Sequence, residues 1–248
     1  MKPQILLLIL PLFVLLIMES IFLNVKTIYL AVILINLGIM YALKKIGEFQ
    51  IKDKSFWIHF ILPFFFVNGL ISYLILNGNL IIIQTLIIIE AFFVFYYLRQ
   101  IYFNKTLKTK VKWENISYYS GFLALFFIFS FIFGSQGSLF SAVYLTLILI
   151  FALILTTYQF FYMQGIREKQ NYIYIFIITL ILTEITWVFF FLPFSYNIGG
   201  LVLAIIYYLI LGLTRLFLKN SLNKKKLKFY LSLSSGCIII ILLTARIF

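Results

Sequence analysis

The chain has 248 residues, of which 64% are hydrophobic and only 11% are charged, and its mean hydropathy is +1.12. A soluble domain is about 45–50% apolar and about 25% charged, so this composition excludes an ordinary water-soluble protein. The formal net charge of +13 could fit nucleic-acid binding, but in so apolar a chain it is better explained by basic loops on the cytoplasmic side of a membrane.

Apolar stretches long enough to cross a bilayer follow one another along the whole chain. They cover residues 4–22, 27–43, 56–76, 80–98, 118–133, 139–162, two spans within 172–218 that are joined by the turn 193–200, and 229–245. No loop between them is long enough for a soluble domain. The sequence therefore predicts an all-α fold, a polytopic transmembrane bundle of about nine helices, forming a single integral membrane domain over residues 1–248.

The basic residues predict the orientation of this bundle. The N-terminus and the loops 44–54, 99–116, 163–171 and 215–228 hold 18 of the 20 Lys and Arg residues, whereas the other side has only Lys26 and Arg246. Since basic loops remain in the cytoplasm, we expect a cytoplasmic N-terminus and a C-terminus outside.

The first apolar stretch has two interpretations. A basic start followed by an apolar run also describes a secretory signal peptide. The small-x-small cleavage pattern is missing after residues 4–22, and a second apolar run follows directly. We therefore expect the first span to be retained.

Two acidic residues, Glu90 and Glu184, lie inside apolar spans. Under the predicted topology each is about ten residues, or about 15 Å, from the outer surface. Tyr207 and Tyr208 fall at about the same depth in the next span. The sequence therefore predicts a layer of two acids and two phenols near the middle of the membrane, with no basic side chain to pair with the acids.

An ionised carboxylate without a cationic partner is strongly disfavoured in a bilayer. Such acids are therefore neutral and hydrogen-bonded, or they hold a cation, or a water-filled cavity reaches them. The first of these is a packing role, and the other two are functional. Thr183 and Trp187 flank Glu184 and would either cement helix packing or line a polar path. The candidate substrate- or ion-binding residues are Glu90, Glu184, Tyr207, Tyr208, Thr183 and Trp187.

Sequence motifs of intramembrane enzymes are missing. The chain has no Gly-x-Ser-x-Gly and no His-Glu-x-x-His pattern. Its single histidine, His59, and single cysteine, Cys237, exclude a site built from several His or Cys ligands. We predict no cofactor and no metal, and we expect His59 to be capped or solvated rather than a ligand.

Three functions remain open. The first is a small transporter or permease-like protein that uses the mid-membrane acids with a proton or small cation. The second is a non-catalytic membrane subunit or scaffold, and the third is an intramembrane enzyme acting on a lipid, for which Trp57, His59 and the 99–116 loop offer interfacial polar groups. We expect anionic lipid headgroups to bind the basic loops, a protein partner or a homo-oligomer, no nucleic acid, and a prokaryotic plasma membrane as the location.

Overall fold

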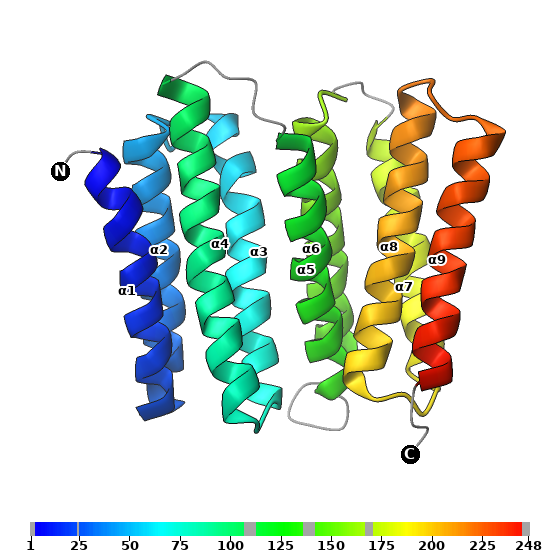
Figure 1. The fold of residues 1–248 in the computed structure, drawn as a ribbon, viewed down its shortest axis with the longest axis horizontal. Coiled ribbons are helices and arrows are strands. Elements are labelled where there is room, and N and C mark those ends of the chain that lie inside the picture. The colour runs from blue at the N-terminus through cyan, green and yellow to red at the C-terminus, as the bar shows by residue number, and fades with distance from the viewer. Residues whose placement is uncertain (1–2, 24, 107–112, 136–141, 167–170, 245–248) are drawn as a thin grey trace. The chain divides into compact units, whose positions relative to one another are not determined.

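The computed structural model describes residues 3–23, 25–106, 113–135, 142–166 and 171–244 (Figure 1). Within these ranges the chain forms nine α-helices and no β-strand. The helices are α1 (Pro3–Leu23), α2 (Ile28–Ile46), α3 (Lys54–Leu76), α4 (Leu80–Thr106), α5 (Trp113–Gly134), α6 (Ala142–Met163), α7 (Asn171–Phe189), α8 (Tyr196–Leu218) and α9 (Lys224–Thr244), and the short 3-10 helix η1 (Val25–Thr27) lies between α1 and α2. Over the described residues this confirms the predicted all-helical bundle.

Each of the nine helices is long and apolar enough to span a membrane. Their candidate spans contain 19 to 26 residues, and an α-helix of about 20 residues is about 30 Å long, the thickness of the bilayer's hydrocarbon core. Only a helix satisfies all its backbone hydrogen bonds within one apolar segment, which is why these stretches fold as helices. The chain is therefore built as an integral membrane protein.

Three helices are clearly longer than predicted. α4 continues past residue 98 to Thr106, α5 begins at Trp113 instead of residue 118, and α9 begins at Lys224 instead of residue 229. Lys and Arg are good helix formers, so a basic stretch need not end a helix. The side chain of Asn223 accepts a hydrogen bond from the backbone N–H of Lys226 at 2.8 Å and caps the start of α9.

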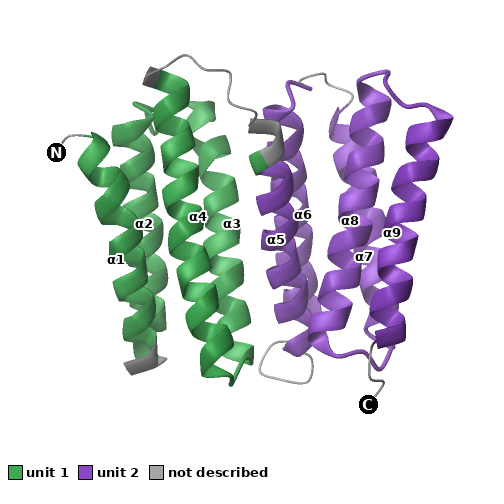
Figure 2. Ribbon diagram, in the orientation of Figure 1, with its two compact units in different colours: residues 1–116 green, residues 117–248 purple. Residues whose placement is uncertain are grey.

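The helices group into two compact units, residues 1–116 and residues 117–248 (Figure 2). We call them unit 1 and unit 2 and describe each by itself. Unit 1 holds α1 to α4, and unit 2 holds most of α5 together with α6 to α9. The single membrane domain over residues 1–248 stays a prediction.

In unit 1, α4 packs against α1, α2 and α3, and α2 also packs against α1 and α3. The buried face of α4 thus lies among three other helices. In unit 2, α8 packs against α7 and α9, and α6 packs against α7.

A close approach of backbones joins α5 to α8. A Cβ atom built on Gly200 would lie 2.1 Å from Ser130 Oγ and 2.8 Å from the Ser130 backbone nitrogen. Only glycine fits there, as is common where membrane helices touch through small residues.

Most of the described basic residues of unit 1 gather at one end, and Lys26 of η1 lies at the other. Lys44 and Lys45 end α2, Lys54 begins α3, and Lys105 ends α4. We call this the basic end of unit 1, and the end where α3 stops and α4 begins the opposite end. Which end faces the cytoplasm stays a prediction.

Candidate functional site

Glu90 lies on the buried face of α4. Its side chain is 0% exposed, and Ile83, Ile87 and Val94 of the same face are also buried. Since this face packs among α1, α2 and α3, a carboxyl group sits inside an apolar helix bundle.

Neither carboxyl oxygen of Glu90 has a hydrogen-bond partner within the described part of the chain. Buried polar groups are normally paired, and leaving one unpaired costs about 1–3 kcal/mol, more if it is charged. A carboxyl group without a protein partner in this environment is the kind of group that binds a proton or a small cation.

Two asparagines of neighbouring helices form a polar layer in unit 1. Asn36 Nδ2 donates to Asn68 Oδ1 at 3.1 Å, and Asn68 Nδ2 donates to Asn36 Oδ1 at 3.2 Å. Counting along the helices from the opposite end, both asparagines lie about 12 Å deep and Glu90 about 15 Å deep. Neither asparagine is among the predicted site residues, although an asparagine inside an apolar span is a usual sign of a polar contact between helices.

The face of α4 that carries Glu90 continues towards the basic end. Tyr97 follows Glu90 by seven residues, or two helical turns, and is buried. Its hydroxyl donates to the backbone oxygen of His59 at 2.7 Å. Seven residues further, Asn104 helps to line a pocket that also contains His59. One face of α4 therefore presents polar groups from the middle of the helix to its basic end.

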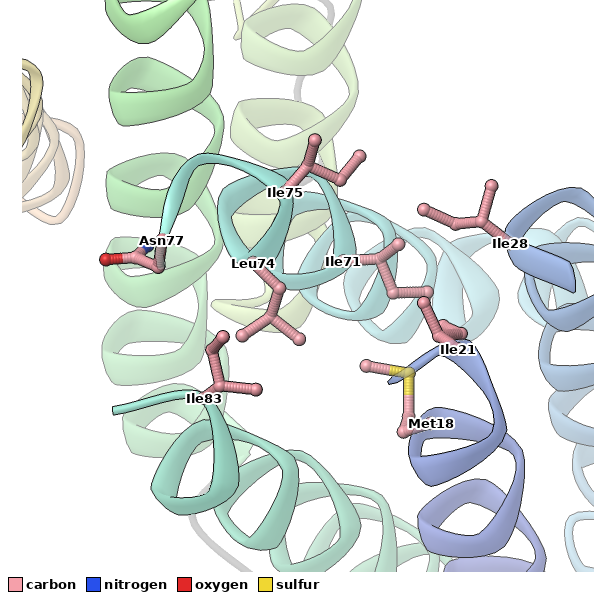
Figure 3. A pocket seen from close by; sticks show the side chains of 8 residues that line it. All are labelled: Met18, Ile21, Ile28, Ile71, Leu74, Ile75, Asn77 and Ile83. Atoms are coloured by element: carbon pink, nitrogen blue, oxygen red, sulfur yellow. The ribbon is translucent and has the colours of Figure 1, made fainter. Parts of the chain in front are cut away.

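A cavity of about 220 Å³ lies at the opposite end of unit 1 (Figure 3). It is lined by Met18, Ile21, Ile28, Ile71, Leu74, Ile75, Asn77 and Ile83. Asn77 turns its amide away from the other side chains and donates to Tyr73 O at 2.9 Å. The lining is thus almost entirely hydrocarbon. Ile83 lies two turns from Glu90 on the same face of α4, so the cavity and the acid share one helix face.

Glu184 is placed differently, because its side chain on α7 is exposed. Leu180, Val188 and Phe191, on the neighbouring turns of the same face, are exposed as well. The acid therefore lies in an apolar surface rather than in the interior of unit 2.

Thr183 and Trp187 make local contacts. Thr183 Oγ1 donates to Thr179 O one turn earlier at 2.8 Å. Trp187 is 42% exposed, and its ring lies edge-on to Phe190 at 5.9 Å. These contacts suit a packing role for Thr183 and a surface position for Trp187.

Tyr207 and Tyr208 point in different directions. Tyr207 is buried, with its hydroxyl 3.4 Å from Thr157 Oγ1 on α6. The Tyr208 ring instead lies 4.1 Å from the Tyr118 ring of α5, and Tyr118 Oη donates to Tyr208 O at 3.3 Å. The two adjacent phenols therefore serve two different helix contacts.

Of the six predicted site residues, Glu90 belongs to unit 1 and the other five belong to unit 2. Whether they form one site stays a prediction. Glu90 is the one that combines a charge-bearing group with full burial and no protein partner. Within the described residues, no group of three or more His, Cys, Asp or Glu side chains could hold a metal ion.

Nine apolar helices in the described part of the chain, with buried polar groups inside each unit, define the protein as a polytopic helical membrane protein. The chain belongs to the family described as "Protein of unknown function (DUF5656)", whose model matches residues 4–244. No curated protein and no solved structure matches the chain. The family match thus extends over both units.

Proposed function

We propose that the protein is a small transporter or permease-like membrane protein in which Glu90 binds a proton or a small cation. One observation carries the proposal: the Glu90 carboxyl is fully buried among four helices and neither oxygen has a protein partner in the described residues. Intramembrane acids of this kind mark ion pathways and proton relays.

The cavity at the opposite end of unit 1 supports the same function. It lies on the α4 face that carries Glu90, and its lining is hydrocarbon. A site of this kind admits an apolar molecule or the apolar part of one. The proposed substrate is therefore apolar or amphipathic, and the ion at Glu90 is the coupling ion.

The test is the melting temperature of the purified protein in detergent. It is measured from about pH 5 to about pH 9, with and without monovalent and divalent cations, because a bound ion stabilises the folded state by mass action. The parent should show an ion-dependent shift that Glu90→Gln abolishes. Glu184→Gln, the same substitution at an exposed position, should keep the shift. A parent whose melting never depends on Glu90 would overturn the proposal.

The exposed position of Glu184 favours a second candidate, a non-catalytic membrane subunit. A carboxyl group on the apolar surface of a spanning helix is costly against lipid, and α7 presents Glu184 among exposed apolar residues. A partner protein or a second copy that supplies a polar group would remove this cost. Crosslinking through Val188→Cys, at an exposed position one turn after Glu184, in a Cys237→Ala background that keeps Glu184, would distinguish the two candidates, because a subunit gives a specific crosslinked product.

For location we propose a prokaryotic plasma membrane, with the N-terminus in the cytoplasm and the basic loops against anionic lipid. The distribution of basic residues supports this orientation.

A further inference from the structure

The basic end of unit 1 holds a pocket that the proposed transport function does not use. It has a volume of about 190 Å³ and is lined by Gly47, Phe49, His59, Ile101, Asn104 and Lys105. The pocket thus combines a cationic side chain, an imidazole and an amide with an aromatic wall.

The α2–α3 loop forms one wall of this pocket. The Phe49 ring stacks on the His59 ring at 4.7 Å, and a Cβ atom on Gly47 would lie 2.3 Å from the Phe49 ring. Gly47 is therefore needed for Phe49 to reach His59. A hydrogen bond from α3 also holds the loop in place, because Trp57 Nε1 donates to the backbone oxygen of Ile51 at 2.9 Å.

His59 has a defined proton arrangement. Its Nδ1 lies 2.8 Å from Ser55 O, and a carbonyl oxygen only accepts, so Nδ1 carries the proton. Nδ1 therefore cannot take a proton from the Ser55 hydroxyl, 3.4 Å away. None of the lining residues is a Ser, Thr or Cys nucleophile. This arrangement suits binding rather than cleavage.

Positive charge surrounds the pocket. Lys105 forms an ion pair with Glu48, whose side chain is 77% exposed. A second, open hollow that also borders Phe49 and Glu48 is lined by Lys44, Lys45 and Lys52. Because Glu48 is largely in solvent, an anion with more charge can replace it at Lys105 at small cost.

Exposed apolar residues lie beside these lysines. Ile51 is 48% exposed and Trp57 is 47% exposed. Tryptophan and lysine together at a helix end are typical of the lipid headgroup region. The pocket therefore opens beside a surface suited to lipid headgroups.

We propose that this pocket binds the phosphate of an anionic phospholipid headgroup, with Lys105 and Asn104 donating to the phosphate and Phe49, His59 and Ile101 against its glycerol. Basic pockets between membrane helices are known to take such headgroups. The proposal does not depend on Glu90, so the two can fail separately.

The test is the affinity of the purified full-length protein for dioleoylphosphatidylglycerol, measured by native mass spectrometry and by thermal shift, with dioleoylphosphatidylcholine as the neutral reference. The parent should prefer the anionic lipid. Lys105→Gln should weaken that binding about tenfold, the value of one charge-assisted hydrogen bond. Glu48→Gln should strengthen it, because the competing carboxylate is gone.

The matched control is Lys225→Gln, which removes the same charge from the exposed start of α9 in unit 2. It should leave the affinity within about twofold of the parent. If Lys105→Gln and Lys225→Gln lower the affinity for the anionic lipid equally, the lipid responds to the overall charge of the protein and the pocket is not its binding site. A parent protein that binds the anionic and the neutral lipid equally well would also contradict the proposal. If inorganic phosphate raises the melting temperature through Lys105 as much as the lipid does, the pocket binds free phosphate rather than a lipid headgroup. If Lys105→Gln does not fold, the affinity of Glu48→Gln tests the proposal instead: a higher affinity for the anionic lipid supports the pocket, and an unchanged affinity contradicts it.

Discussion

At the scale of single residues, the two intramembrane acids have opposite environments. Glu90 is fully buried and unpaired in the described part of unit 1, whereas Glu184 is exposed on α7. A buried group that makes no hydrogen bond contributes nothing to stability in return for its desolvation. Its retention in the core is therefore better explained by a ligand than by packing.

The contrast between the unpaired Glu90 and the hydrogen-bonded Asn68 predicts opposite results for two apolar substitutions in unit 1. Glu90→Met, which keeps the side-chain length, should keep or raise the melting temperature because no hydrogen bond is lost. Asn68→Leu should destabilise the protein by about 0.5–2 kcal/mol, because Asn36 Oδ1 loses its donor and Asn36 Nδ2 keeps only its bond to Val32 O. Thermal unfolding in detergent measures both. Strong destabilisation by Glu90→Met would show that Glu90 is a packing residue.

At the scale of helices, close contacts between small residues determine which helices can pack. Ser130 and Gly200 bring α5 and α8 together in unit 2. Gly121, also on α5, has no atom within 4 Å of the place where a Cβ atom would lie. The two glycines thus provide a test and its control.

Gly200→Ala should destabilise the protein by about 1–3 kcal/mol, because the added methyl group collides with the Ser130 backbone. Adding Ser130→Ala should not restore stability, since the backbone nitrogen still blocks the site. Gly121→Ala should be neutral or stabilising by up to about 1 kcal/mol through helix propensity. Melting temperatures of the three variants are compared. If Gly200→Ala melts like the parent, α5 and α8 do not approach this closely.

Much of the helical architecture could be predicted from sequence, because run length and apolarity alone decide whether a segment spans a membrane. The end of α4 and the starts of α5 and α9 lie outside the predicted spans, since polar and basic residues permit a helix as readily as a loop. The environments of Glu90 and Glu184 could not be distinguished. Both acids lie in predominantly apolar runs, and the threonines beside Glu184 do not show which side of the helix is buried, so the sequence has no clear polar face that would separate interior from surface. The Asn36–Asn68 pair depends on how α2 and α3 pack, which neither segment encodes alone.

At the scale of the whole molecule, two helical units share one family match over residues 4–244. The described basic residues of unit 2 lie at the ends of helices, as in Arg215 of α8 and Lys224 of α9. This pattern is what the positive-inside rule expects of a polytopic protein.

The predicted orientation is tested by fusing a reporter enzyme that is active only outside the plasma membrane. A fusion after Phe248 should be active, and a fusion after Lys226 should be silent, since the 215–228 loop is expected in the cytoplasm. A silent fusion after Phe248 together with an active fusion after Lys226 would show that the predicted orientation is the wrong way round. A reporter that is active at both positions would show that α9 does not cross the membrane.

The most direct test of the central claim is infrared difference spectroscopy of the Glu90 carboxyl in the reconstituted protein. A proton or cation that binds Glu90 must change the carbonyl band of the protonated acid when pH is raised or cations are added. The account predicts such a change in the parent and in Glu184→Gln, and its loss in Glu90→Gln. A band that persists unchanged in Glu90→Gln, or a parent band that no pH or cation alters, would contradict the claim that Glu90 is an ion-binding group.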